Sequence, residues 1–207
     1  MTTEVWYTSY GSNTHVDRLA HYLTGGTPPD GSRTYPGCRD PRLPSASVPV
    51  ELEGALYFAT ESAVWTGGRA FYDPHAEGRV LARAHRITAG QFSDIAAQEM
   101  YRDPGPDTDL DLTAVLRDGT AVLGDGRYET LVSPGTLHGL PLLTFTAPWR
   151  MHDVEWNPPA AGYLRHLAAG LIATGAWDTD TVVAYLASRP GAAGHWTERL
   201  IRDLVAP

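Results

Sequence analysis

The sequence predicts an α+β domain with a mixed or antiparallel, barrel-like sheet, flanking helices and additional C-terminal helices. Three observations predict it. Short β-prone segments fill most of the first two thirds of the 207 residues, one long polar segment interrupts them, and helical spacing dominates the end of the chain. A chain of this length can bury a sizeable hydrophobic core.

The first half is expected to be mainly β-structure. Residues 5–10 are aromatic and β-prone, and they run into a turn at residues 10–13. A helix is expected next, ended by the glycine pair at residues 25–26. Residues 25–49 are rich in Pro, Gly, Ser and Arg, which predicts a long surface loop of the kind that is often functional. Strands are then expected over residues 53–59, 70–72 and 79–87.

The second half begins with a helix over residues 89–101, which the proline-rich turn at residues 103–106 ends. Short strands are expected near residues 114–116, 130–132 and 142–145. Helical spacing covers residues 163–174, 179–188 and 196–205. Asp178 stands where an N-cap belongs, and Gly175 stands where a helix ends.

Composition narrows the function classes. The 16 basic residues are all arginine, and with 24 acidic residues they give a net charge of -8, which argues against a nucleic-acid partner. A single cysteine, Cys38, excludes an internal disulfide and favours a reducing compartment. Neither a secretory signal nor an apolar run long enough for a membrane helix is visible. We therefore expect a soluble, cytoplasmic protein without a membrane partner.

Glu99 is the first candidate catalytic residue. Phe92, Ile95, Ala96 and Glu99 share one face of the helix expected over residues 89–101, so the carboxylate occupies a position that the pattern reserves for an apolar side chain. Burial of a carboxyl raises its pKa toward the range of a general acid or base. The alternative is a Glu at a helix end that turns to solvent or pairs with Arg102.

The turn at residues 10–13 is the second candidate. Gly11 allows close approach of a ligand, and successive N–H groups beside a helix N-terminus can bind a carboxylate or an oxyanion. The alternative is an ordinary strand-to-helix connection in which Ser12 or Asn13 caps the helix.

Most other chemistries lack their motifs. The sequence contains no nucleophile elbow, no phosphate-binding glycine loop, no zinc-ligand spacing and no complete calcium loop. Cys38 lies in a loop without a nucleophile signature and is interpreted as a structural or surface thiol. We therefore expect neither a metal ion nor a cofactor.

Three segments together resemble the γ-glutamylcyclotransferase family, over about residues 4–175. They are the strand and turn ending in Tyr10-Gly11-Ser12-Asn13, the segment 65–70 with Gly67 and Gly68, and the pair Gln98-Glu99. Tyr163 matches more weakly a tyrosine that lines the family's site and opens a helix. The chain is accordingly expected to be a single domain, 1–207, with a helical C-terminal extension over about residues 176–207.

The resemblance implies an enzyme that cyclises a γ-glutamyl amide to 5-oxoproline and releases the free amine, so that the nucleophile belongs to the substrate. It implies that Glu99 is the general acid/base. The implied substrate-binding residues are Tyr10, Gly11, Ser12, Asn13, Gly67, Gly68 and Tyr163.

The sequence also departs from the family. Thr14 and Met100 replace the usual neighbours of the two motifs, and residues 103–127 and those after 178 are additions. Two alternatives therefore stay open, an enzyme of the same fold that cleaves or deprotects another amide, and a small-molecule binding module without catalysis. The sequence leaves the oligomeric state open, with a homodimer as one option.

Overall fold

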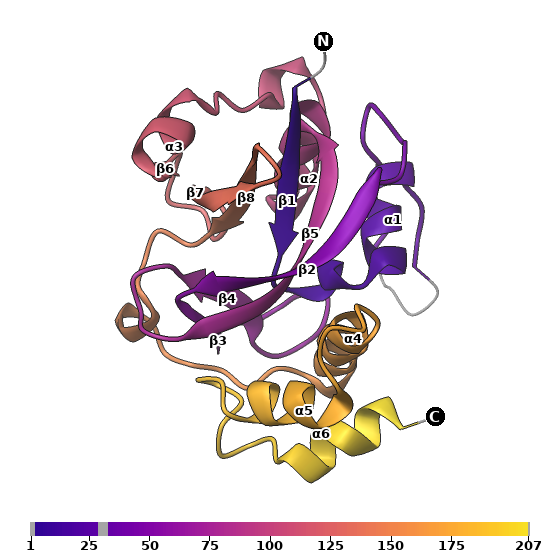
Figure 1. Ribbon diagram of the computed structural model, residues 1–207, viewed down its shortest axis with the longest axis vertical. Coiled ribbons are helices and arrows are strands. Elements are labelled where there is room, and N and C mark those ends of the chain that lie inside the picture. The colour runs from indigo at the N-terminus through magenta and orange to yellow at the C-terminus, as the bar shows by residue number, and fades with distance from the viewer. Residues whose placement is uncertain (1–2, 29–32, 207) are drawn as a thin grey trace. The chain divides into compact units, whose positions relative to one another are not determined.

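The computed structural model describes residues 3–28 and 33–206 (Figure 1). Residues 29–32 of the long predicted loop lie outside the described residues. The chain divides into two compact units, each built from three separate segments. Unit 1 consists of the described residues of Met1–Thr8, Asp17–Val48 and Ala84–Pro148, and unit 2 of those of Ser9–Val16, Pro49–Arg83 and Trp149–Pro207.

The main sheet is mixed, as predicted, and open rather than closed, with strand order β2-β5-β1-β8-β7-β6. Strand β1 runs parallel to β8, whereas β7 is antiparallel to both β6 and β8. The strands are β1 (Glu4–Ser9), β2 (Ala46–Glu53), β5 (Arg79–Thr88), β6 (Thr120–Val122), β7 (Thr130–Leu137) and β8 (Leu140–Thr146).

Unit 1 has its core between this sheet and helix α2 (Ala89–Glu99). The rings of Tyr7, Phe92 and Phe145 lie 5.5–5.9 Å apart between their centroids and join β1, α2 and β8. Helix α2 begins with a capping box, in which the Gln91 N–H donates to the Thr88 hydroxyl and the Thr88 N–H donates to the Gln91 side chain. This reciprocal cap fixes the start of the helix that carries Glu99.

The strands predicted from the sequence need correction at several points. Residues 114–116 form part of helix α3 (Thr113–Asp118), which Gly119 ends with a φ of +80°. Strand β2 begins at Ala46, inside the predicted loop. It was missed because a largely exposed edge strand shows no alternation of apolar and polar residues. Strand β6 was not predicted, since it has only three residues.

Unit 2 contains a separate antiparallel pair of strands, β3 (Ala55–Ala59) and β4 (Arg69–Asp73). The single strand predicted over residues 53–59 is interrupted at Gly54, whose φ of +121° breaks the extended chain. Helices α4 (Ala161–Ile172), α5 (Thr179–Ala187) and α6 (Glu198–Val205) pack against one another (Figure 1).

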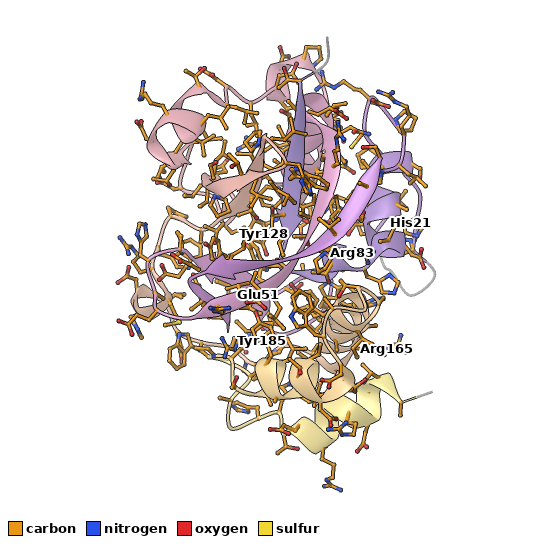
Figure 2. All side chains as sticks on the ribbon, viewed as in Figure 1. His21, Glu51, Arg83, Tyr128, Arg165 and Tyr185 are labelled. Atoms are coloured by element: carbon orange, nitrogen blue, oxygen red, sulfur yellow. The ribbon has the colours of Figure 1, made fainter. Side chains whose placement is uncertain are left out.

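The expected helix signals of unit 2 are confirmed. The Asp178 carboxylate accepts a hydrogen bond from the Thr181 N–H at 2.8 Å, and Gly175 has a φ of +73° after α4. Helix α5 carries Tyr185, which is labelled in Figure 2. The hydroxyl of this residue accepts a hydrogen bond from the Leu81 N–H at 3.2 Å and ties the helix to its unit. Within the described part of the chain, none of the helices is both apolar and long enough to span a bilayer.

Candidate active site

Glu99 is the last residue of α2. The face predicted from helical spacing is confirmed, because Phe92, Ile95 and Ala96 are all buried in the core of unit 1. Glu99 at the end of this face is half-buried. Arg102, the partner considered for Glu99 in the alternative interpretation, forms an ion pair with Glu129.

Two buried tyrosines lie beside the Glu99 carboxyl. The Tyr22 hydroxyl donates a hydrogen bond to the carboxylate, and it also shares a hydrogen bond with the Tyr35 hydroxyl. The centroids of the two tyrosine rings lie 4.4 Å apart. Behind them, the Arg18 guanidinium donates to the Tyr35 hydroxyl and lies 4.9 Å from the centroid of that ring. A connected chain of polar groups therefore leads from Arg18 to Glu99.

The pKa of the Glu99 carboxyl is raised above its ordinary value. Burial of the carboxyl is the main cause, and it outweighs the hydrogen bond from Tyr22 and the nearby charges of Arg18, Arg127 and Arg33, all of which lower the pKa. Burial also raises the pKa of Tyr22 well above its ordinary value, so this hydroxyl stays protonated and acts as a donor. A carboxyl tuned in this way can exchange protons closer to neutral pH.

The C-terminus of α2 has a distinctive geometry. The Arg102 N–H donates to the Ala97 carbonyl at 2.9 Å, and the Tyr101 N–H donates to the Gln98 carbonyl at 3.1 Å. This pattern is the Schellman motif, which places one residue in the left-handed region. Here that residue is Tyr101, with a φ of +58°, where glycine is usual.

The turn at residues 10–13 lies in unit 2 and forms the short 3₁₀ helix η1 (Ser12–Thr14). Its N-cap is Gly11, so neither Ser12 nor Asn13 takes the capping position considered for them. The Thr14 N–H and hydroxyl both donate to the Gly11 carbonyl, at 3.1 and 2.9 Å. Successive N–H groups at the start of a helical turn can bind an anion, which is the role predicted for this turn.

Tyr163 on α4 lies next to this turn within unit 2. A Cβ added to Gly11 would stand 3.3 Å from the Tyr163 hydroxyl, so glycine permits the close approach of the two. The hydroxyl accepts a hydrogen bond from the Ala70 N–H at 3.2 Å, and the Trp65 ring lies 5.5 Å from the tyrosine ring. Tyr10 is buried with its ring 5.8 Å from that of Tyr72.

Gly67 and Gly68 have a packing explanation of their own. A Cβ on Gly68 would lie 1.9 Å from the Asn157 carbonyl oxygen, and one on Gly67 would lie 2.9 Å from that of Pro158. Both glycines therefore allow the chain before α4 to approach β4 closely. Their role in substrate binding stays a prediction.

The predicted site residues fall into two sets. Glu99 belongs to unit 1, whereas the residues predicted to bind substrate belong to unit 2. The structure brings Gly11 and Tyr163 together inside unit 2. That the two sets serve one site stays a prediction.

Sequence reasoning missed the side chains around Glu99. Arg18 and Tyr22 are four residues apart on one helix, which is a signal that they share a face. No sequence spacing connects the others to Glu99, because Arg33 and Tyr35 come from the long loop and Arg127 comes from the addition over residues 103–127.

The other groups that the sequence singled out have clear surroundings. Two arginines that were left outside the predicted site form ion pairs. Arg39 pairs with Asp94 and Asp109, and Arg42 pairs with Asp40. Burial raises the pKa of the Cys38 thiol to about 12, which disfavours the reactive thiolate form. Residues 3–28 and 33–206 contain no group of three metal-ligating side chains, and the expectation that no metal is needed stays a prediction.

Comparison with solved structures identifies the fold. A structure described as γ-glutamyl cyclotransferase matches over 98% of both chains with a TM-score of 0.52 and 15% sequence identity. The fold is that of γ-glutamyl cyclotransferase. The structure of an uncharacterized protein from Homo sapiens also matches this chain, over 98% of both chains, with a TM-score of 0.52 and 16% sequence identity. The predicted resemblance is thus confirmed for the fold.

Sequence comparisons add one relative. Histone deacetylase 5 from Arabidopsis thaliana is 29% identical over 201 residues, a match that covers 88% of this chain. The chain spans about 30% of the length of that protein. No protein-family model matches the sequence.

Proposed function

We propose that the chain is an enzyme that cyclises γ-glutamyl amides to 5-oxoproline and releases the free amine. The observation that carries the proposal is the Glu99 carboxyl, half-buried and hydrogen-bonded to Tyr22, in a chain with the γ-glutamyl cyclotransferase fold. Its raised pKa suits a group that takes up a proton and returns it within one turnover.

The proposed reaction needs only proton transfer from the protein. The α-ammonium of the substrate loses a proton, its nitrogen attacks the γ-carbonyl carbon, and the C–N bond to the leaving amine breaks. The lactam nitrogen keeps one of the three ammonium protons, and the other two end on the leaving nitrogen, which departs as an ammonium ion. Glu99 accepts these protons and passes them on, while a fixed substrate pose makes the intramolecular attack fast.

The residues that the resemblance implies for substrate binding all belong to unit 2. The amides of residues 11–13 hold the α-carboxylate or the developing oxyanion, as such turns do for anions. Tyr10 and Tyr163 form apolar walls with hydroxyl groups, and the short distance between Gly11 and Tyr163 supports a shared role.

The test is detection of 5-oxoproline by mass spectrometry after incubation with glutathione and a panel of γ-glutamyl amino acids and amines. We expect turnover by the wild type, with or without EDTA, and a loss of about 100-fold or more in Glu99→Gln, the usual range for removal of a general acid/base. Glu77→Gln, which changes an exposed carboxylate, is the matched control and keeps the wild-type rate.

The other outcomes separate the alternatives. Free glutamate in place of 5-oxoproline would mean that water attacks and that the enzyme is an amidase. Binding of the panel without turnover would identify a binding module. Full activity of Glu99→Gln would refute the proposed acid/base.

A further inference from the structure

Two arginines flank the end of α2 beside the candidate acid/base. Arg33, from the long loop, donates a hydrogen bond to the Gln98 carbonyl at 2.9 Å. Arg127, from the addition over residues 103–127, donates to the Glu99 carbonyl at 2.6 Å. The two guanidinium groups are thereby held at consecutive backbone carbonyls, those of Gln98 and of Glu99 itself.

Tyr101 links the two arginines. The guanidinium carbon of Arg33 lies 4.3 Å from the centroid of the Tyr101 ring, and that of Arg127 lies 4.5 Å from it. Such stacking holds a guanidinium while leaving its N–H groups directed sideways. Tyr101 itself is 51% exposed and adopts a φ of +58°, a left-handed backbone angle that favours glycine. A bulky residue at a strained position often marks a function.

Neither arginine has a carboxylate partner of its own in the part of the chain that the structure describes. Their charges act on the Glu99 carboxyl, but among the described residues neither Arg33 nor Arg127 forms an ion pair, whereas Arg39, Arg42 and Arg102 of the same unit do. Each uses one N–H group on a backbone carbonyl, and a guanidinium carries five such donors. Capping of the helix C-terminus alone would explain one bond from each arginine but not their shared aromatic support.

We infer that Arg33 and Arg127, aligned by Tyr101, bind a carboxylate on the leaving group of the substrate. The inference rests on the proposed function, since it requires that the scissile amide lies at Glu99. A carboxylate accepts paired N–H donors from guanidinium groups with good geometry. The enzyme would therefore select γ-glutamyl amino acids and peptides over γ-glutamyl amines, and the three residues would determine this specificity.

The experiment compares two substrates that differ in one group, γ-glutamyl-alanine and γ-glutamyl-ethylamide. The measured quantity is the ratio of their kcat/KM values. We expect the wild type to prefer the carboxylate substrate at least 10-fold, and Arg33→Gln and Arg127→Gln each to reduce this preference about 10-fold, as expected for loss of a charge-assisted hydrogen bond. Arg199→Gln, which changes an exposed arginine on α6, is the matched control and keeps the preference.

Tyr101→Gly tests the role of the aromatic ring separately from that of the helix end. Glycine adopts the backbone angle at this position without strain, so the helix end is preserved while the aromatic ring is lost. We expect a melting temperature that is unchanged to within a few degrees and a preference that falls about 2- to 5-fold, the factor that corresponds to loss of one stacked guanidinium at an exposed site.

Failure of this inference can be distinguished from failure of the proposed function. Turnover of both substrates without a preference in the wild type, or a preference that survives in both arginine variants, would overturn the carboxylate site and leave the cyclisation intact. If neither substrate yields 5-oxoproline, calorimetry of both compounds with the wild type and Arg127→Gln decides the question. Tighter binding of γ-glutamyl-alanine that is lost in Arg127→Gln would support the carboxylate site, and equal or absent binding would refute it.

Discussion

Removal of the Tyr22 hydroxyl should raise the pKa of Glu99. In Tyr22→Phe the ring still fills its place in the core, and the main loss is the hydrogen bond to the carboxylate. A hydrogen bond to a charged group contributes about 1.5–3 kcal/mol, and the protonated carboxyl keeps part of this in the wild type. With about 1.4 kcal/mol for each pKa unit, the pKa of Glu99 should rise by about 1 unit.

The assay is carbon-detected NMR of protein labelled at the glutamate carboxyl carbons, with the Glu99 signal assigned from its absence in Glu99→Gln. The acidic limb of the pH profile of kcat/KM should move to higher pH by the same amount. Tyr185→Phe is the control, because it removes a partly buried hydroxyl of unit 2 that accepts a hydrogen bond from the Leu81 N–H and not from any group at Glu99. An unchanged or lowered pKa of Glu99 in Tyr22→Phe would refute the role assigned to this hydrogen bond.

Three further predictions concern stability and reactivity. Because the pKa of Glu99 is raised, the folded chain holds this proton more tightly than the unfolded chain does, so wild-type stability falls as pH rises from the unfolded-state pKa through the folded-state pKa. In urea titrations, the stability of Glu99→Gln relative to wild type should therefore grow from acidic to neutral pH. A difference that shrinks would contradict the raised pKa. Gly68→Ala should lower the free energy of unfolding by about 3 kcal/mol, because the added Cβ would meet the Asn157 carbonyl oxygen. Gly105→Ala is the control and should change it little, because no atom lies within 4 Å of its added Cβ. Equal melting temperatures of the two variants would contradict the close packing at Gly68. Cys38, with a pKa of about 12, should react with iodoacetamide at least about 100-fold more slowly in the folded chain than in urea, and comparable rates would show that the thiol is accessible.

The sequence predicted those parts of the fold whose local signals agree with their packing. Helix α2 has helical spacing, and a proline-rich turn follows it, so its end was predicted to within two residues. Residues 114–116 were misassigned because a run of three apolar residues fits either structure, and only Val115 of them is buried. The start of β2 gave no signal, because most of its side chains are partly or fully exposed.

The candidate site was predictable only in part. Glu99 could be found because a carboxylate on an apolar face contradicts the helical pattern around it. Arg33 and Arg127 could not, since an arginine in a polar segment has the same appearance whether it is solvated or fixed. Their positions depend on how the long loop and the segment 103–127 return to the end of α2. Local sequence propensities do not predict such tertiary contacts.

The parallel pairing of β1 with β8 also has a consequence for synthesis on the ribosome. Trp6 on β1 donates its indole N–H to the carbonyl of Leu137, 131 residues further along the chain. At 5–20 residues per second, about 7–26 s pass between the translation of these two partners. During that interval the first strand, whose side chains are nearly all buried in the finished protein, lacks the neighbour that covers one edge. Until β8 has been made, this edge of an aromatic strand is open to pairing with other chains.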